Sequence, residues 1–519
     1  IRYEPLLDSG SGGSGGGRAD QSMILPVSGA RHVQYKQRYG FNRKGVVVMN
    51  REFVRASSRR DFFRQSAAVM AAFTLVPRAA RAESGGGIAP FSCDITPPLG
   101  TPWYPSYGPL GEIEHPLLAK GVVLEDAGGR YVLCALDYCE LRNSAYDRAC
   151  ATLAEAAGTT PDRVAVHTVH QHTAPMVDPE AFALADTVAS PPPHPDLTTM
   201  ERLLAQLAET VRTAASQMVP WNRVGTGRAR VERVASNRRV RGEDGKILTR
   251  FSSCKDPKLV EAPEGLVDPW LKTVTFARDD TPLVRLHYYA THPQSFYGDT
   301  RSTYDFPGMA REWLERREGI PQVYFTGCAG NIAAGKYNNG TPEAREGLYL
   351  RLRAAMETAA RATAYEPAQP ITWRTTSLQL EPITSGELAP DALMAALENT
   401  AHSHNIRLDA AMCRVFQERT RKPFLLTALD TGKLVLIHLP GEMAVEFQLY
   451  AQTIQPDRFV AVAAYGDCAP SYVNPASFFQ EGGYEASASL VVPESEQRVL
   501  AAIRQLAGLP AQDPGDAKA

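Results

Sequence analysis

Residues 164–175 read Val-Ala-Val-His-Thr-Val-His-Gln-His-Thr-Ala-Pro, so an apolar run is followed at once by a cluster of histidines. The apolar run, Val164–Val166, is typical of a buried strand. Side chains two residues apart on a strand point to the same face, so we expect His170 and His172 to face one cavity, while His167 faces elsewhere or starts the turn. Neutral imidazole is the commonest protein ligand of metals. The stretch therefore predicts a zinc site at a strand end, the alternative being a polar strand end with incidental histidines.

The composition of the whole chain is that of a globular protein. The chain has 519 residues, of which 44% are apolar and 22% are charged, so it can bury a substantial core. A formal net charge of -2 gives no basic surface for nucleic acid, and no apolar run is long enough to span a bilayer. We therefore expect neither a nucleic-acid partner nor a transmembrane segment, while contact with a membrane surface and the oligomeric state stay open.

The N-terminal part of the chain is expected to lie outside the catalytic domain. Residues 1–48 include a long glycine- and serine-rich run, which cannot bury enough surface to order itself. The segment Ser-Ser-Arg-Arg-Asp-Phe-Phe at 57–63, a weakly apolar stretch and Ala-Arg-Ala at 80–82 then look like a twin-arginine export signal, the alternative being an ordinary amphipathic helix. We expect a disordered or spurious extension over 1–48, an export signal over 49–82, and a periplasmic or secreted mature chain.

The pattern from Ala89 onwards alternates short apolar runs with amphipathic stretches and shows no internal repeat. The expected strands are 131–136, 163–167, 274–276, 284–289, 323–325 and 433–438. The expected helices are 200–218, 305–317, 342–364 and 494–506. This mixture predicts an α/β to α+β fold with layered mixed β-sheets flanked by helices, in one domain over 83–519.

The eight cysteines give no sign of a structural metal site. They contain no Cys-x-x-Cys pair, so a zinc site built from thiolates is not expected. Disulfide bonds and buried free thiols both stay open.

Two further metal-ligand candidates follow predicted strands. His292 comes at the end of the strand 284–289, where α/β sheets present ligands, although a hydrogen-bonded core histidine is the alternative. Glu442 follows the strand 433–438 through a Pro-Gly turn. It could complete a His/His/Glu zinc set, the alternative being an acidic residue that favours a helix start.

A glycine-rich loop, 327–335, follows the strand 323–325. Such a loop lets backbone N–H groups approach a substrate, and Asn331 and Lys336 are the candidate substrate-binding residues. The loop lacks the spacing of a P-loop or a dinucleotide fingerprint, so a nucleotide site is rejected. Cys328 is expected to be a buried thiol rather than a nucleophile.

Two loop tyrosines, Tyr472 and Tyr484, lie twelve residues apart among glycines and polar groups. A tyrosine hydroxyl can bind a metal or donate a hydrogen bond to an oxyanion. The alternative is that both rings only pack in the core.

These segments, in this order, resemble the neutral/alkaline non-lysosomal ceramidase family, specifically its N-terminal catalytic domain. The resemblance extends from about Ala89 to about Leu506. Its most specific matches are His-Gln-His-Thr-Ala-Pro at 170–175, Pro-Gly-Glu at 440–442 and the block 472–485 that ends in Gly-Gly-Tyr-Glu. The resemblance implies a zinc-dependent hydrolase that cleaves the amide bond of an N-acyl substrate, such as a sphingolipid.

The resemblance also implies a role for each matching residue. The four implied zinc ligands are His170, His292, Glu442 and Tyr472. His172 would transfer a proton, and Tyr484 would donate a hydrogen bond together with a family arginine. That arginine matches Arg238, with the adjacent Arg239 as the alternative.

The chain departs from the family pattern in two places. In the loop 330–335, Asn331 stands where the family has Asp, and Ala333 stands where the family has Ser. We expect no counterpart of the immunoglobulin-like C-terminal domain of the longer members within these residues. These departures leave open a zinc hydrolase of another acyl conjugate or ester, and a non-catalytic exported protein that binds a metal or lipid.

Overall fold

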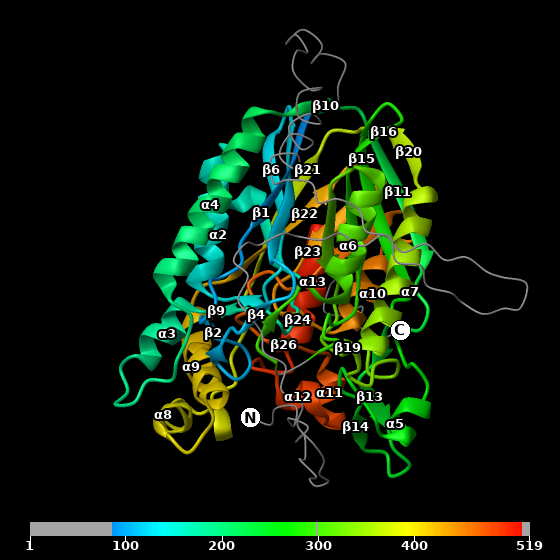
Figure 1. Cartoon of the computed structure of the whole chain (residues 1–519). Coiled ribbons are helices and arrows are strands. Elements are labelled where there is room, and N and C mark those ends of the chain that lie inside the picture. Colours follow the sequence, from blue (N-terminus) through cyan, green and yellow to red (C-terminus); the bar gives the residue numbers. More distant parts are fainter. Residues whose placement is uncertain (1–85, 297–298, 511–519) are drawn as a thin grey trace, which may run out of the picture. The chain divides into compact units, whose positions relative to one another are not determined.

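The computed structural model describes residues 86–296 and 299–510 (Figure 1). The chain divides into two units, of which Leu6–Ala80 lies wholly outside the described residues. The predictions of an extension over 1–48 and an export signal over 49–82 concern residues outside the described part, so they stay predictions. Among the described residues, no helix is both long and apolar enough to cross a membrane.

The first sheet mixes parallel and antiparallel pairing. Its strands, in spatial order, are β10 (Val219–Trp221), β1 (Gly86–Asp94), β5 (Leu118–Asp126), β6 (Gly129–Leu136) and β8 (Val164–Thr168). The β6–β8 pair is parallel, and β8 is buried along its whole length, as strands covered on both faces are. The helices α2 (Ser144–Ala157) and α4 (Leu197–Ser216) flank this sheet on the left of Figure 1.

The second sheet follows in the sequence and is flanked by helices on the right of Figure 1. Its strands, in spatial order, are β18 (Gln322–Thr326), β16 (Thr281–Tyr289), β15 (Trp270–Arg278), β11 (Arg223–Arg230) and β20 (Ala364–Pro367). The β16–β18 pair is parallel and the others are antiparallel. The helices α6 (Asp305–Glu318) and α7 (Pro342–Arg361) pack against it.

The third sheet comes from the C-terminal part of the chain. Its strands, in spatial order, are β21 (Thr372–Leu378), β22 (Phe424–Asp430), β23 (Leu434–His438) and β25 (Phe459–Ala463). The helices α10 (Val445–Thr453) and α13 (Ser495–Leu506) pack against its strands. The β23–β25 pair is parallel, so each of the three sheets contains one parallel pair.

Short elements connect the sheets and lie mainly at one end of them, the lower end in Figure 1. The short helices are η3 (Pro161–Arg163), α3 (Pro179–Ala185), α5 (Pro257–Glu261), η4 (Gly386–Leu388), α8 (Pro390–Glu398), α11 (Ala476–Glu481) and α12 (Tyr484–Ser487), with the longer α9 (His404–Arg419) among them. The short strands are β2 (Pro102–Trp103), β3 (Gly108–Pro109), β4 (Glu112–Ile113), β7 (Glu140–Leu141), β9 (Met176–Val177), β12 (Ser236–Asn237), β13 (Arg239–Arg241), β14 (Ile247–Thr249), β17 (Arg301–Ser302), β19 (Ile332–Ala333), β24 (Glu442–Met443) and β26 (Tyr472–Val473).

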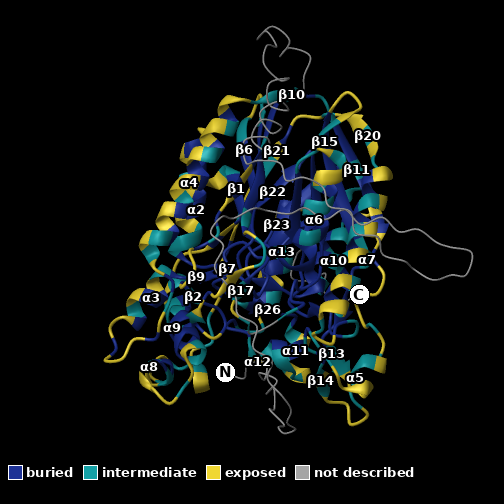
Figure 2. Cartoon of the chain, in the orientation of Figure 1, coloured by how far each residue is buried: buried dark blue, intermediate teal, exposed yellow. Residues whose placement is uncertain are grey.

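The predicted fold class, layered mixed sheets flanked by helices, is confirmed. Figure 2 shows why the apolar runs predicted the strands so well: buried residues fill the sheets, while the helices expose their outer faces. Helix α4 is an example, because Leu203, Leu207 and Val211 recur at helical spacing and are all buried against the first sheet.

A buried ion pair joins the first sheet to helix α6. Asp137, directly after β6, and Arg311, on α6, are both fully buried. Each of the two oxygens of Asp137 accepts a hydrogen bond of 2.8 Å from the guanidinium of Arg311, and one of them also accepts from the backbone N–H of Leu118 at 3.0 Å. This two-bond geometry fixes the helix against the end of the strand.

Candidate metal centre

Three polar side chains meet where one strand from each sheet ends. His170 follows β8 of the first sheet, His292 follows β16 of the second, and Glu442 follows β23 of the third. Backbone hydrogen bonds join the second and third sheets in this region, as from the N–H of Ala464, directly after β25, to the carbonyl of Thr326, the last residue of β18, at 3.0 Å. The site is therefore a product of the whole fold rather than of one local motif.

The three side chains form a tight, buried cluster. Nε2 of His170 lies 3.2 Å from Oε2 of Glu442, and Nε2 of His292 lies 3.0 Å from the same oxygen. One potential ligand atom from each residue lies within 4.8 Å of the others, and all three side chains are buried. This donor set matches the two histidines and one carboxylate found in many catalytic zinc sites.

Backbone carbonyls fix the two rings in the orientation that a metal needs. Nδ1 of His170 donates to the carbonyl of Cys139 at 2.9 Å, and Nδ1 of His292 donates to the carbonyl of Ala329 at 2.7 Å. Since a carbonyl only accepts, each Nδ1 carries a hydrogen, and the neutral ring presents a lone pair at Nε2. Two lone pairs and a carboxylate then face one point, an arrangement that a divalent cation stabilises.

The pKa shifts of Glu442 and His170 come from the attraction between the carboxylate and the facing imidazoles. Burial favours neutral Glu442, but the facing His170 and His292 outweigh it and hold the pKa of the carboxyl well below its usual range. Burial also opposes protonation of His170, but the carboxylate of Glu442 outweighs it and raises the pKa of the ring. Burial, together with the guanidinium of Arg238, lowers the pKa of His292 to about 4. The donor set and the orientation of the two rings fit a metal cation.

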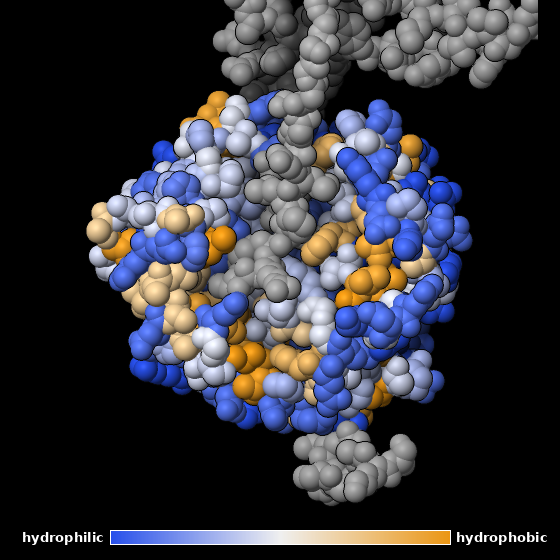
Figure 3. Space-filling model, turned by 90° about the horizontal axis from the view of Figure 1, so that it is seen from below, coloured by the Kyte–Doolittle hydropathy of each residue, from blue (hydrophilic) through white to orange (hydrophobic). Residues whose placement is uncertain are grey.

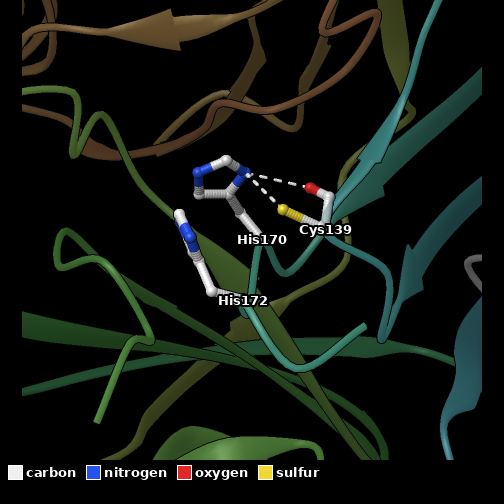
Figure 4. Close-up of side chains that lie close together, drawn as sticks. All are labelled: Cys139, His170 and His172. Atoms are coloured by element: carbon white, nitrogen blue, oxygen red, sulfur yellow. Dashed lines mark hydrogen bonds between the residues drawn. The ribbon is translucent and has the colours of Figure 1, made fainter. Parts of the chain in front are cut away.

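His170 and His172 reach this cluster from a loop, and the prediction that they share a strand is wrong. Strand β8 ends at Thr168, and His170 has a left-handed backbone with φ of 70°. The two rings still lie together, with centroids 5.0 Å apart, and Figure 4 shows them beside Cys139. His167 is on β8, where its Nδ1 donates to the carbonyl of Ala464 at 2.7 Å.

Tyr472 and Arg238 lie next to the cluster. Strand β24 pairs with β26 in a register that places Glu442 opposite Tyr472. The hydroxyl of Tyr472 accepts a hydrogen bond of 2.8 Å from Arg238, which also donates to the hydroxyl of Ser252 at 3.1 Å. Arg239 points elsewhere and pairs with Glu481 at 2.8 Å, so Arg238 is the arginine that faces the cluster.

A cavity of about 90 Å³ opens beside these residues. His170, His172, Glu442, Tyr472 and Tyr484 all line it. The ring of Tyr484 packs edge-on against that of Tyr472, with centroids 5.5 Å apart. The structure thus brings together seven of the predicted site residues, since Arg238 and His292 are tied to the lining residues by the contacts above.

Comparison with solved structures shows the same fold in known hydrolases. Neutral ceramidase from Pseudomonas aeruginosa superimposes with a TM-score of 0.60 at 17% sequence identity, over 83% of this chain and 76% of that one. The chain has the fold of neutral ceramidase. A ceramidase complexed with C2 superimposes with a TM-score of 0.58 at 15% identity, over the same shares of both chains. No protein-family model matches the sequence, and no curated protein matches it.

The glycine-rich loop of this ceramidase-like fold supports Glu442 rather than lining the cavity. A Cβ on Gly330 would lie 2.4 Å from the carbonyl oxygen of Glu442, so only glycine lets the loop pack this closely. The side chain of Asn331 donates to Glu446 at 3.0 Å and accepts from the backbone N–H of Val445 at 2.9 Å. Asn331 therefore fixes the start of helix α10 and is not among the described residues that line the cavity.

Lys336 is also directed away from the cavity. Its ammonium donates to the carbonyl of Val260 at 2.6 Å and also to those of Glu261 and Ala262, at the C-terminal end of α5. A cation at this end of a helix satisfies carbonyls that have no partner within the helix. The contacts give Lys336 a structural role and do not support its predicted contact with substrate.

Replacing Lys336 with methionine is expected to lower stability and leave the metal site intact. The loss of a charged donor to these carbonyls should cost about 1 to 2 kcal/mol in the free energy of unfolding. Chemical denaturation and metal analysis of the same preparation check this. A variant with unchanged stability but weaker substrate binding would instead support the predicted contact between Lys336 and the substrate.

Two residues at the centre carry no sequence motif that marks them. The ring of Tyr465 stacks on that of His170 with centroids 4.3 Å apart, and Tyr465 is fully buried. Oε1 of Glu140 lies 3.9 Å from Nδ1 of His170, and the other oxygen pairs with Arg142. Glu140 lies four residues beyond β6, so the rule that placed His292 and Glu442 at strand ends could have found it. Tyr465 looks like an ordinary core residue.

Proposed function

We propose that the chain is a zinc-dependent amidohydrolase that cleaves the bond between an acyl group and an amine, as ceramidases do. The observation that carries the proposal is the convergence of His170, His292 and Glu442, each from a different sheet, with both Nε2 lone pairs turned toward the carboxylate. The shared fold with ceramidases supports it.

His170, His292 and Glu442 would hold the metal, with the hydroxyl of Tyr472 as the fourth ligand. Zinc bound by such a set lowers the pKa of a water molecule toward about 7 and polarises a carbonyl group. Arg238 supports Tyr472, because its hydrogen bond to the tyrosine oxygen stabilises negative charge on that oxygen. Glu442 is occupied as a ligand, so it is not the general base.

His172 is the residue best placed to move a proton to the leaving amine. It lines the cavity, and its ring centroid lies 5.0 Å from that of His170 and 5.9 Å from that of His292. A neutral imidazole near reacting atoms can take a proton from water and pass it to nitrogen. Tyr484, on the same cavity wall, would donate a hydrogen bond to the oxygen of the attacked carbonyl, with Arg238 close to its ring.

Replacing Tyr484 with phenylalanine is expected to slow turnover without releasing the metal. The loss of one donor to a developing oxyanion typically lowers kcat by roughly a hundredfold to a thousandfold. Steady-state kinetics and metal analysis check this, with Tyr365→Phe on strand β20 as the matched control. A Tyr484→Phe variant with wild-type kcat would remove Tyr484 from the mechanism.

The substrate class is proposed as an N-acyl amide of a lipid-like amine. Figure 3 shows hydrophobic side chains gathered in several patches on the face seen from below, where an apolar substrate would find matching surface. The purified chain should release free amine from N-acyl amides and react more slowly with esters of the same acyl group. Hydrolysis of the esters alone would contradict the amide proposal.

We also propose that the protein is exported through its twin-arginine segment and acts in the periplasm or outside the cell. Mass spectrometry of the N-terminus of the mature protein tests this directly. A mature form that retains Arg59 and Arg60 would contradict it.

A further inference from the structure

Tyr465 stacks on one face of a candidate metal ligand. Its ring lies on that of His170, with centroids 4.3 Å apart and ring planes 24° apart, and it meets the ring of His292 edge-on with centroids 6.0 Å apart. Tyr465 is fully buried and is not among the described residues that line the cavity, so it is not placed to touch a substrate there. The proposed chemistry gives this side chain no role.

The backbone of Tyr465 joins two of the segments that carry the ligands. Its N–H donates to the carbonyl of Gly441, the residue before Glu442, at 3.0 Å. Its carbonyl accepts from the N–H of Thr168, two residues before His170, at 2.8 Å. One residue therefore connects the end of a strand in the first sheet to the turn that follows a strand in the third.

Both residues of the stack have a left-handed backbone. The φ angle is 70° at His170 and 61° at Tyr465, a region that is unfavourable for residues other than glycine. Such conformations persist only where the surrounding structure enforces them, and they are concentrated at functional sites. The stack therefore joins two backbone positions that the fold maintains against their local preference.

The ring of His170 has fewer hydrogen bonds to orient it than the ring of His292. Nδ1 of His292 lies within hydrogen-bond distance of two carbonyls, that of Ala329 at 2.7 Å and that of Ile332 at 3.1 Å. Nδ1 of His170 has one such carbonyl within the part of the chain that the structure describes, at 2.9 Å. A single bond at one edge lets a ring tilt, and a second ring packed on its face opposes the tilt. Tyr465 supplies that second ring.

The contacts of Tyr465 with the ligand segments come from its ring and its backbone. Its hydroxyl has no hydrogen-bond partner among the described residues. Phenylalanine at this position keeps the flat face and the backbone bonds, whereas leucine keeps only the backbone bonds. Leucine also has an unbranched Cβ, as tyrosine does, so the cost of the left-handed backbone is comparable. The two substitutions therefore separate the effect of the stacked ring from that of the backbone.

We propose that Tyr465 is a positioning residue, whose ring holds the imidazole of His170 with its Nε2 toward Glu442 and thereby raises the affinity of the site for a metal. This inference rests on the metal site of the proposed function. It is tested by metal affinity, which can be measured without turnover.

The test measures the zinc affinity of three chains by competition with a chromophoric chelator. Tyr465→Leu should bind zinc about 10- to 100-fold more weakly than the wild-type chain, which is the usual loss when a residue that orients a ligand is removed. Tyr465→Phe should bind zinc as the wild-type chain does, because it keeps the stacked face. With cobalt in place of zinc, the visible absorption bands report the ligand geometry, and they should change in Tyr465→Leu but not in Tyr465→Phe.

Tyr288→Leu is the matched control. Tyr288 is also buried, and its ring stacks on that of Phe325 with centroids 5.0 Å apart rather than on a ligand. This variant should lose stability and keep its zinc affinity, which separates the orientation of a ligand from a general loss of packing. Circular dichroism checks the fold of each variant. If Tyr465→Leu does not fold, Tyr465→Met provides the same comparison, because it fills more of the space without a flat ring.

Three results would overturn the role of the ring. They are a folded Tyr465→Leu or Tyr465→Met variant with wild-type zinc affinity, a loss of affinity in Tyr288→Leu as large as that in Tyr465→Leu, and an equally large loss in Tyr465→Phe. If affinity falls as expected while the wild-type chain hydrolyses no N-acyl amide, the positioning role stands and the hydrolase proposal fails. A wild-type chain that binds no zinc would overturn both.

Discussion

Replacing His170 with alanine is expected to remove the bound metal and the amide hydrolysis together. His170 supplies one of the two nitrogen ligands, and its position is fixed by the bond from its Nδ1 to the carbonyl of Cys139. Without it, only His292, Glu442 and Tyr472 remain, and no other described histidine except His172 lies in the cavity. Loss of metal activation returns the attacking water toward its pKa in bulk, so we expect turnover to fall by more than about a thousandfold.

Metal content and turnover must be measured on the same preparation, because the prediction is that they fall together. His404→Ala, at the exposed start of helix α9, removes a histidine that the structure places outside the site and should change neither quantity. Circular dichroism separates loss of the metal from loss of the fold. A folded His170→Ala variant that is free of metal and still fully active would refute the proposed site.

Breaking the buried pair of Asp137 and Arg311 is expected to be among the most destabilising single changes in the chain. Replacing Arg311 with methionine leaves the carboxylate of Asp137 buried without its two hydrogen bonds of 2.8 Å. Removing one partner of such a pair typically costs about 3 to 5 kcal/mol in the free energy of unfolding. The midpoint and slope of urea unfolding measure this cost.

Two control variants test whether the loss of stability comes from the burial of this ion pair. Replacing both Asp137 and Arg311 with leucine should recover much of the lost stability, because no unpaired charge is left inside. Arg212→Met breaks an exposed pair with Glu209 and should cost no more than about 1 kcal/mol. An Arg311→Met variant as stable as the Arg212→Met variant would show that the buried pair does not hold α6 to the sheet.

The sequence could indicate where the candidate ligands lie, because their places near strand ends depend on a local signal. His292 lies three residues after β16 and Glu442 lies four residues after β23, and mainly apolar runs of this kind form buried strands whose ends the fold brings together. The same signal locates the strand before His170. The left-handed backbone of His170 could not be predicted, because a distant contact fixes it, the hydrogen bond from its N–H to the carbonyl of Tyr138 at 2.9 Å.

The contacts of the candidate residues Arg238, Arg239 and Lys336 could not be predicted, because they depend on tertiary structure and not on a local sequence pattern. Arg238 and Arg239 are neighbours in the sequence, yet one reaches Tyr472 and the other reaches Glu481. Lys336 binds carbonyls about seventy residues earlier in the chain, at the end of the short helix α5. Sequence alone gives the residue types near the site but not the partner that each one finds.

The burial of the cysteines and of Asp409 also could not be predicted from the sequence. All eight cysteines are free thiols in the structure, and seven of them are buried, which decides between the two alternatives that the sequence left open. Asp409 lies in helix α9, and an aspartate in an amphipathic helix is normally predicted to face solvent. Only the packing of α9 beside the cavity shows that its side chain is buried.

The central claim is that a metal held by His170, His292, Glu442 and Tyr472 is needed for amide hydrolysis. Its most direct test is to measure bound metal and hydrolysis of an N-acyl amide in one preparation, before chelation, after chelation and after zinc is added back. We expect about one metal ion per chain, loss of hydrolysis with the metal, and recovery of both with zinc. Undiminished hydrolysis by the fully metal-free chain would contradict the account.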